Sequence, residues 1–333
     1  MDVNKLYGKI SKIIDANNKF VIITHDCPDG DSLGSQIALY QLLILLKKEV
    51  ILVCNCEIPY QYKFLPYIDR IYKNFEEVKK SDNNGQYICF CLDCADEHRM
   101  NLDFKDLKDN FKYIVNIDHH YNNTNFGDLN IVDIKKSATA EILYELISSN
   151  YPGMMDDVIA EGIYVGILTD TGKFQYSNTN SDVHKTVSEL LKFNVYPSKI
   201  SKYIYECEPL ERFKLIQIVF QRIEFIPSAG LIYSYVLQKD FKKLNLPFSA
   251  QDGIIDLLRS AEKVKIAALI KQTEKRCFKI SLRTSDSNID LFKIASKFNG
   301  GGHKMASAYA DRGSLRTVMN NLKKSVKESI DNG

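Results

Sequence analysis

The sequence FVIITHDCPDGDSLGS, residues 20–35, joins an apolar, strand-like run to a turn that carries three side chains able to bind a metal. His25, Asp29 and Asp31 fall within seven positions, and Gly30 lies between the two acids. Pro, Asp and Gly are common turn formers, so the stretch taken alone is also compatible with an ordinary loop. Its interpretation therefore depends on what the rest of the chain supplies.

Apolar, β-branched runs recur through the first half of the chain, at 20–25, 49–54, 86–93, 112–118 and 129–134. Helix-like segments lie between several of these runs, notably at 32–47, and another at 138–149 follows the last run. This alternation predicts an α/β fold with a mostly parallel sheet that carries helices on both faces. Sheets of this kind bind ligands beyond the carboxyl ends of their strands, which is where the turn after residue 25 begins.

From about residue 181 to 222 the pattern turns helical and more charged. Strand-like runs then reappear at 222–226, 230–238, 264–272 and 277–284, with helical patterns near 251–261, 289–298 and 314–329. This order predicts a second, smaller α/β domain with a mixed sheet. We therefore expect a first domain over 1–185, a helical connector over 186–222 and a second domain over 223–333.

The composition is that of a folded globular protein with room for two cores. The chain has 333 residues, of which 45% are hydrophobic and 26% are charged. Lys and Arg number 44 against 42 Asp and Glu, so the formal net charge is +2. A protein without an overall basic field is not expected to coat long duplexes, and contact with nucleic acid would need a local basic patch.

The apolar segments predict neither a signal peptide nor a membrane span. The first twenty residues mix apolar and charged side chains at helical spacing. The richest apolar stretch, 37–46, is too short to span a bilayer and is followed by Lys47 and Lys48, which favours a buried helix. The eight cysteines form no matched pair of CxxC motifs, so we expect reduced cysteines and a cytoplasmic protein.

Further acids and histidines end three other apolar runs: Asp93, then Asp118 with His119 and His120, and finally Asp170. If each run is a strand, four elements deliver these side chains to one edge of the sheet. Imidazole and carboxylate donors suit Mn, Mg, Fe or Zn. Six donors are too many for one tetrahedral ion and fit two ions that share a carboxylate: His25, Asp29, Asp31, Asp93, His119 and Asp170. Gly30 would let the carboxylates beside it turn inward, and Ser32 would cap the following helix.

The ordered set of motifs resembles a known family. THDCPDGDSLGS, LDCAD, IDHH and GILTDTGKFQYSNT are similar to the four motifs of the DHH phosphoesterase superfamily, and NGGGHKMASAY is similar to the GGGH signature of its DHH-associated C-terminal domain. The segment SATAEILYELI (137–147) further resembles the NrnA-like branch of nanoRNases and pAp phosphatases. The resemblance runs over essentially the whole chain.

This resemblance implies roles for the metal-binding residues. His25 and Asp29 would hold a first ion, and Asp93 would bridge the two ions. Asp31, His119 and Asp170 would complete the binding site of the second ion. We expect two divalent ions, with manganese as the first choice and magnesium or another divalent ion as the alternative.

The resemblance also implies roles close to the substrate. His120 would face the scissile phosphate as an electrostatic stabiliser or proton donor, Asp118 would orient a histidine, and Arg99 would contact phosphate. The second motif of the branch often reads Asp-Thr-Ala-Asn, whereas Cys94 and Asp96 stand in this chain. An acid at 96 near a phosphate site would narrow the choice of substrate.

The second domain would bind the rest of the substrate. Backbone amides of a glycine-rich loop can cradle a phosphate, and a histidine can donate to it or stack on a base: Gly300, Gly301, Gly302 and His303. Arg283 matches a family arginine that reads a distal phosphate, a task suited to a planar guanidinium. Ala308 departs from the usual glycine at the end of the motif.

The leading hypothesis is a metal-dependent phosphoesterase that cleaves short oligonucleotides to mononucleotides and dephosphorylates 3′-phosphoadenosine 5′-phosphate (pAp). Its partners would be short single-stranded oligonucleotides or nucleotides, with no membrane involved. The alternative within enzymes is a phosphodiesterase for cyclic or linear dinucleotides such as c-di-AMP or pApA. A nucleotide-binding regulatory protein is the alternative outside enzymes. The sequence leaves open whether the chain forms a homodimer.

Overall fold

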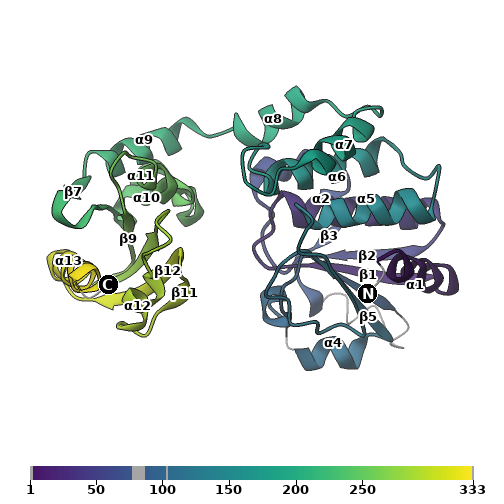
Figure 1. Cartoon of the computed structure of the whole chain (residues 1–333), viewed down its shortest axis with the longest axis horizontal. Helices are drawn as coiled ribbons and strands as arrows, with labels where there is room; N and C mark the ends of the chain where they lie inside the picture. The colour runs from purple at the N-terminus through teal and green to yellow at the C-terminus, as the bar shows by residue number, and fades with distance from the viewer. Residues whose placement is uncertain (1–2, 77–86, 103, 332–333) are drawn as a thin grey trace. The chain divides into compact units, whose positions relative to one another are not determined.

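The computed structural model describes residues 3–76, 87–102 and 104–331 and divides the chain into two compact units (Figure 1). The first unit spans Met1–Cys207 and the second spans Glu208–Gly333. Helices expected to form one connector are divided between the units. The first unit contains α7 (Ser181–Leu190) and α8 (Pro197–Tyr205), whereas α9 (Leu210–Phe220) belongs to the second.

The first unit is built on a six-stranded sheet in which every neighbouring pair of strands is parallel. The strand order is β3-β2-β1-β4-β5-β6, with β1 (Lys19–Thr24), β2 (Glu49–Val53), β3 (Ile71–Tyr72), β4 (Ile88–Leu92), β5 (Tyr113–Asp118) and β6 (Leu129–Val132). The prediction of a parallel sheet is thus confirmed. The short edge strand β3 was not predicted.

Helices cover both faces of this sheet, as the sequence predicted. Residues of β1 alternate between two cores, because successive side chains of a strand point to opposite faces. Phe20 and Ile22 join the core that contains α1 (Val3–Ala16), α2 (Gly30–Leu45) and α5 (Thr139–Asn150). Val21 and Ile23 join the core under α4 (Phe104–Asn110) and the short helix η3 (Glu97–Met100), and α4 lies on the opposite side of the sheet in Figure 1.

The apolar run that ends at Asp170 is helical, so the expectation of a fourth strand there is wrong. It forms α6 (Asp157–Asp170), which packs against α2. An apolar run that is buried on all sides lacks the 3.6-residue period by which helices are recognised. Glycines allow close approach of α6 to α2: a Cβ on Gly34 would lie 2.2 Å from the Gly162 carbonyl oxygen, and one on Gly166 would lie 2.7 Å from Asp31 Oδ1.

The predicted buried helix at 37–46 corresponds to the C-terminal part of α2, which ends at Leu45 and is buried along almost its whole length. Among the helices in the described residues, none is both long and apolar enough to cross a membrane.

The strand order places a topological switch point between β1 and β4. From β1 the chain passes to β2 on one side, while β4, β5 and β6 extend the sheet on the other. In open parallel sheets the crevice outside the carboxyl ends of such strands binds ligands. His25 directly follows β1 and Asp93 directly follows β4, so both stand at this point.

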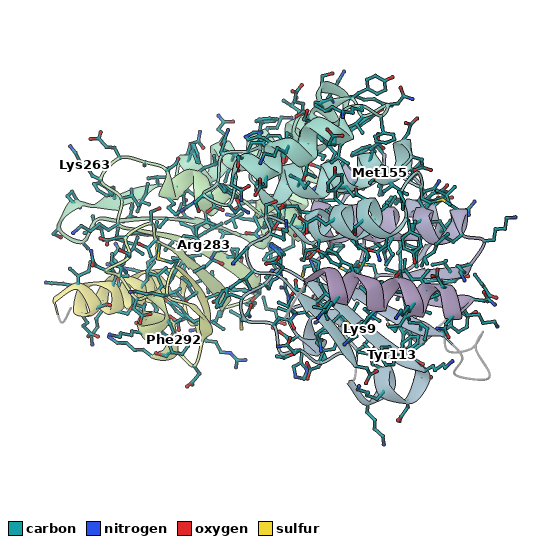
Figure 2. All side chains as sticks on the ribbon, turned by 45° about the vertical axis from the view of Figure 1, so that its right-hand side comes forward. Lys9, Tyr113, Met155, Lys263, Arg283 and Phe292 are labelled. Atoms are coloured by element: carbon teal, nitrogen blue, oxygen red, sulfur yellow. The ribbon has the colours of Figure 1, made fainter. Side chains whose placement is uncertain are left out.

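The second unit contains a mixed sheet of order β11-β12-β10-β9-β8-β7, which confirms the predicted smaller α/β domain. Its strands are β7 (Glu224–Ile226), β8 (Leu231–Val236), β9 (Ile266–Glu274), β10 (Cys277–Arg283), β11 (Gly301–His303) and β12 (Ala306–Arg312). One face packs on α9, α10 (Gln238–Leu244) and α11 (Ile254–Arg259). The other face packs on α12 (Leu291–Ser296) and α13 (Leu315–Asp331). Figure 2 labels Arg283 at the end of β10 and Phe292 on α12.

Candidate metal centre

A first group of metal-binding side chains lies at the ends of β1 and β4. His25 Nε2 is 3.4 Å from Asp93 Oδ2 and 3.9 Å from Asp29 Oδ1. His25 and Asp93 are each 2% exposed, whereas about half of the Asp29 side chain is accessible. One nitrogen and two carboxylate oxygens thus converge at the switch point, as a bound cation requires.

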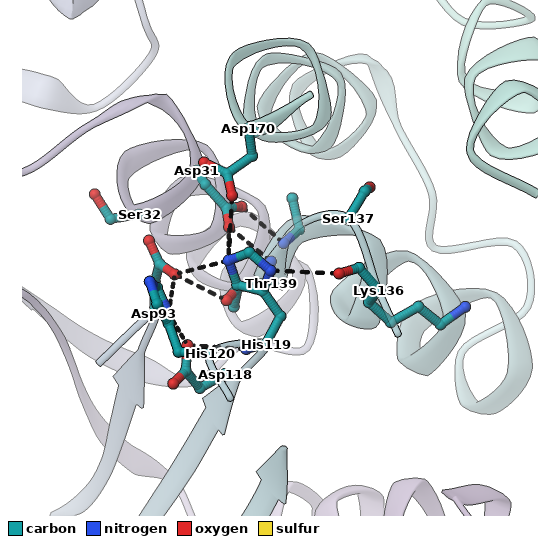
Figure 3. Close-up of polar contacts among 12 residues, drawn as sticks. Asp31, Ser32, Asp93, Asp118, His119, His120, Lys136, Ser137, Thr139 and Asp170 are labelled. Atoms are coloured by element: carbon teal, nitrogen blue, oxygen red, sulfur yellow. Dashed lines mark hydrogen bonds and ion pairs between the residues drawn. The ribbon is translucent and has the colours of Figure 1, made fainter. Parts of the chain in front are cut away.

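A second group combines side chains from α2, from the residue that follows β5, and from α6. His119 Nε2 is 3.2 Å from Asp170 Oδ2 and 3.8 Å from Asp31 Oδ2 (Figure 3). The other ring nitrogen of His119 lies 3.3 Å from the Lys136 carbonyl oxygen. A proton on Nδ1 that is donated to this carbonyl leaves the Nε2 lone pair free for a cation.

Asp93 connects the two groups. Its Oδ2 faces His25, and its Oδ1 is 3.7 Å from His119 Nε2. The backbone of Asp93 is left-handed, with φ of 60°, and its N–H donates to the Ile117 carbonyl of β5. Left-handed φ values are uncommon outside glycine, and they often occur at functional sites. The structure therefore brings together all six residues predicted as ligands, with Asp93 between the two groups.

The charges in this cluster favour the binding of a divalent cation. Burial, together with Asp93 and Asp170, raises the pKa of Asp31, and burial with Asp93 raises that of Asp29. Burial also acts on Asp93, but contacts with histidines lower its pKa. Although burial opposes a charge on His119, the nearby carboxylates, Asp170 foremost, raise its pKa to about 10. Such mutual repulsion among buried carboxylates is what a divalent cation relieves.

His120 stands beside this cluster and is fixed by Asp118. Its Nδ1 is 2.7 Å from Asp118 Oδ1, and the second oxygen of Asp118 accepts a hydrogen bond from Asn123 Nδ2 at 2.6 Å. Asp118 is fully buried, while His120 is about one-third exposed. The hydrogen bond to Asp118 raises the pKa of His120. A histidine held in this way is oriented and favoured in its protonated form.

The turn at 136–140 orients several candidate ligands and was missed by the sequence analysis. The backbone N–H groups of Thr139 and Ala140, at the start of α5, donate to the two oxygens of Asp31 at 2.6 and 2.9 Å. The Thr139 hydroxyl donates to Asp93 Oδ1 at 3.2 Å. In the sequence this segment stands out only by its family resemblance, because the backbone N–H groups of Thr139 and Ala140 carry no signal in residue type.

Glu141 holds this turn in place. It is buried, and its Oε2 accepts hydrogen bonds at 2.8 Å from both the N–H and the hydroxyl of Ser137. The Ser137 carbonyl in turn accepts from Asn178 Nδ2, which also donates to the Asp170 carbonyl. The turn and the end of α6 are therefore joined by one hydrogen-bond network.

At the start of α2, Ser32 takes part in the cap as predicted, but Asp29 is the N-cap residue. The two residues form a capping box: Asp29 Oδ1 accepts from the N–H groups of Asp31 and Ser32, and the Ser32 hydroxyl accepts from the Asp29 N–H at 2.9 Å. Gly30 serves the contact with α6, because a Cβ there would lie 2.4 Å from a methyl carbon of Thr169. Because Gly30 has no side chain, α6 can pack close to the start of α2.

Arg99 lies on the short helix η3 that follows β4, and its carbonyl accepts a hydrogen bond from the Asp26 N–H. Asp96 caps η3, since its side chain accepts from the N–H groups of His98 and Arg99. The departure from the family pattern at 96 therefore has a local structural role. Cys94 is fully buried.

The glycines at 300–302, predicted as a loop that cradles a phosphate, form part of a hairpin. Gly301–His303 is strand β11, which pairs with β12, and Gly301 lies opposite Ala308. The Gly300 N–H donates to the Ala295 carbonyl of α12, so it is not free to bind a phosphate. The side chain of His303 lies outside the part that the structure describes. Arg283 ends β10, and its Nη1 contacts the carbonyl of Leu282.

The parallel sheet, the two groups of carboxylates and imidazoles at its switch point, and the mixed-sheet second unit define the class of protein. Residues 19–167 match the DHH family, N-terminal domain, and residues 229–330 match the DHHA1 domain. The chain therefore contains a DHH family N-terminal domain followed by a DHHA1 domain.

Among curated proteins, the chain is similar to the bifunctional oligoribonuclease and PAP phosphatase NrnA of Thermus thermophilus, with 28% identity over 93% of this chain and 88% of that protein. It is 29% identical to a probable protein of the same name from Streptococcus mutans, over 88% of this chain and 90% of that one. A solved exopolyphosphatase-related protein from Bacteroides fragilis shares the fold, with a TM-score of 0.88 and 23% identity over 98% of this chain and 96% of that one.

Proposed function

We propose that the chain cleaves short oligonucleotides to mononucleotides and removes the 3′-phosphate of pAp. The observation that carries this proposal is the convergence of two metal-binding groups on Asp93 at the switch point of the sheet. Three relatives named as bifunctional oligoribonuclease and PAP phosphatase, or as a probable one, support the choice of substrate at 25–29% identity. A cytoplasmic location and a homodimer stay predictions.

Two divalent cations, which we expect to be manganese, would occupy the cluster. His25 and Asp29 would hold the first ion and share Asp93 with the second. Asp31, His119 and Asp170 would complete the second site. Bound ions would stabilise the negative charge that develops on phosphoryl oxygens during in-line attack.

We assign His120 the task of donating a hydrogen bond, and then a proton, to an oxygen of the scissile phosphate. Asp118 holds Nδ1 at 2.7 Å, which leaves Nε2 of the ring for the substrate. The same hydrogen bond raises the pKa of His120, which favours the protonated form that a proton donor requires. Arg99, Arg283 and His303 stay predictions as further substrate contacts.

A phosphodiesterase for cyclic or linear dinucleotides is the second candidate. The cyclic-di-AMP phosphodiesterase GdpP of Bacillus subtilis is 22% identical over 97% of this chain, which covers 50% of that protein. The absence of one of the six candidate metal-binding residues would favour a nucleotide-binding protein without activity, yet all six residues are present.

One comparative assay tests the proposal. Turnover should be measured with manganese on pAp, on RNA of two, five and about twenty nucleotides, and on c-di-AMP and pApA. We expect the highest kcat/KM on the shortest RNA, together with phosphate release from pAp. Preference for c-di-AMP would favour the second candidate, and no turnover on any substrate would favour the non-enzyme.

The Asp93→Asn variant tests the metal centre itself. It keeps the size of the side chain and removes the charge that the two groups share. We expect fewer than two bound metal ions per chain and loss of turnover, with an unchanged circular dichroism spectrum. Full manganese-dependent turnover in this variant would show that Asp93 does not bridge the ions.

A further inference from the structure

Lys136 contacts two different parts of the first unit through its main chain and its side chain. Its carbonyl oxygen is 3.3 Å from His119 Nδ1. Its Nζ is 3.2 Å from Glu141 Oε1 and also forms an ion pair with Glu145 Oε1. In Figure 3 the carbonyl of Lys136 faces His119, whereas its side chain points away from the metal-binding groups. One residue therefore joins a candidate ligand to the helix α5.

The ammonium of Lys136 lies between two carboxylates with little access to solvent. The side chains of Lys136 and Glu141 are 16% and 3% exposed, whereas that of Glu145 is 38% exposed. Burial opposes a charge on Lys136, but the hydrogen bond to Glu145 and the charges of both carboxylates outweigh it and raise the pKa of Lys136. A buried ion pair is stable only where further hydrogen bonds satisfy its members.

The second oxygen of each carboxylate supplies these hydrogen bonds. Glu141 Oε2 accepts from the N–H and from the hydroxyl of Ser137, both at 2.8 Å. Glu145 Oε2 accepts at 3.0 Å from the hydroxyl of Tyr7, a residue of α1 that is 2% exposed. Lys136 is therefore tied through Glu141 to the next residue of the turn, and through Glu145 to the first helix of the unit.

The turn at 136–140 contacts the two groups of metal-binding side chains unequally. Its backbone N–H groups at Thr139 and Ala140 donate to the two oxygens of Asp31 in the second group. In the part of the chain that the structure describes, neither His25 nor Asp29 forms a hydrogen bond or an ion pair with this turn. A displaced turn should therefore disturb the second ion first.

We propose that Lys136 is a positioning residue for the second metal ion: its ammonium, held by Glu141 and Glu145, fixes the turn so that its carbonyl faces His119. The inference rests on the two-metal centre of the proposed function. A carbonyl in this place accepts the proton on Nδ1 and leaves the Nε2 lone pair for the ion. Loss of such an orienting contact typically weakens metal binding about 10- to 100-fold.

Calorimetric titration of the full-length protein with manganese, after removal of metal with EDTA, tests the proposal. Lys136→Met keeps the apolar stem and removes the ammonium, so affinity for the second ion should fall about tenfold or more. The first ion should bind as in the wild type. Lys136→Arg restores the charge and should recover most of the lost affinity. Lys135→Met, at the exposed neighbouring position, is the matched control and should bind both ions like the wild type.

A second variant and a second readout guard against a simple loss of stability, because Lys136→Met leaves the buried carboxylate of Glu141 without its cation. Glu145→Gln is milder: its amide oxygen still accepts from Tyr7, and only the charge beside Lys136 is lost. Electron paramagnetic resonance distinguishes manganese ions that share a carboxylate, which are magnetically coupled, from an isolated ion. At equal manganese concentration, both variants should show more of the isolated ion than the wild type does.

The outcomes separate this proposal from the proposed function. Wild-type affinity for the second ion in both Lys136→Met and Glu145→Gln, or an equal loss in Lys135→Met, would overturn the role of Lys136. An equal loss of both ions without recovery in Lys136→Arg would also overturn it, since that result indicates general disruption of the fold. If the second ion alone is weakened and Lys136→Arg restores it, yet the wild type hydrolyses no nucleotide, the proposed function fails while the role of Lys136 stands.

Discussion

Replacing Thr139 by Val should loosen the carboxylate at the centre of the metal cluster without changing the volume of the buried side chain. The hydroxyl of Thr139 donates to Asp93 Oδ1 at 3.2 Å, and Thr139 is fully buried. A hydrogen bond to a charged group contributes about 1.5–3 kcal/mol. If this energy holds Asp93 in its bridging position, its loss should weaken metal binding or kcat/KM by roughly 10- to 150-fold. The backbone N–H of Thr139 still donates to Asp31, so that contact is preserved.

The assay combines manganese titration by calorimetry with steady-state kinetics on pAp. Thr139→Ser is the matched control, because it keeps the hydroxyl and loses a methyl group. We expect the Ser variant to lie within a few-fold of the wild type and the Val variant to show the full loss. An equal loss in the Ser variant, which keeps the hydroxyl, would mean that altered packing at this buried position, not the loss of the hydrogen bond to Asp93, carries the effect. An unchanged Val variant would refute the reasoning altogether.

Three further perturbations test other parts of the site. His120→Gln should retain both metal ions and lose about 10²- to 10⁴-fold in kcat, the usual range for a general acid, as shown by metal analysis beside kinetics. Without metal the pKa of His119 is raised to about 10, so manganese must displace a proton from this ring to bind. The apparent affinity for manganese should therefore fall as the pH drops from 8.5 to 6.5. Calorimetry in several buffers can measure both the affinity and the released proton. Gly34→Ala would place a Cβ 2.2 Å from the Gly162 carbonyl oxygen, so urea denaturation should show a loss of about 1–3 kcal/mol.

Most of the first sheet could be predicted because its strands are short, β-branched runs that end in polar turns. β3 could not, since two residues at an edge carry no pattern. The run that ends at Asp170 was misassigned because burial on every side removes the amphipathic period of α6. Its position at the cluster was nevertheless anticipated, since the end of an apolar run is visible whichever way the run folds.

The candidate ligands could be predicted because His and Asp are metal-binding residue types that are visible in the sequence. The groups that orient them were not. Asp31 is held by the backbone N–H groups of Thr139 and Ala140, and His119 by the carbonyl of Lys136. Every residue offers such groups, so the sequence cannot show which ones reach a carboxylate more than a hundred positions away. The fold alone determines those pairings.

The location of Asp170 on a helix has a consequence for the stability of the first unit. Asp31, His119 and Asp170 come from three separate places in the fold: α2, the residue after β5, and α6. An ion bound by all three would work as a cross-link between the sheet and its outer helix layer, and its binding energy would add to the cost of detaching α6. At a free concentration one hundred times the dissociation constant, this linkage amounts to about 2.7 kcal/mol. Removal of metal would therefore expose α6 to proteolysis before the strands beneath it, and a cell short of metal would lose the protein as well as its activity.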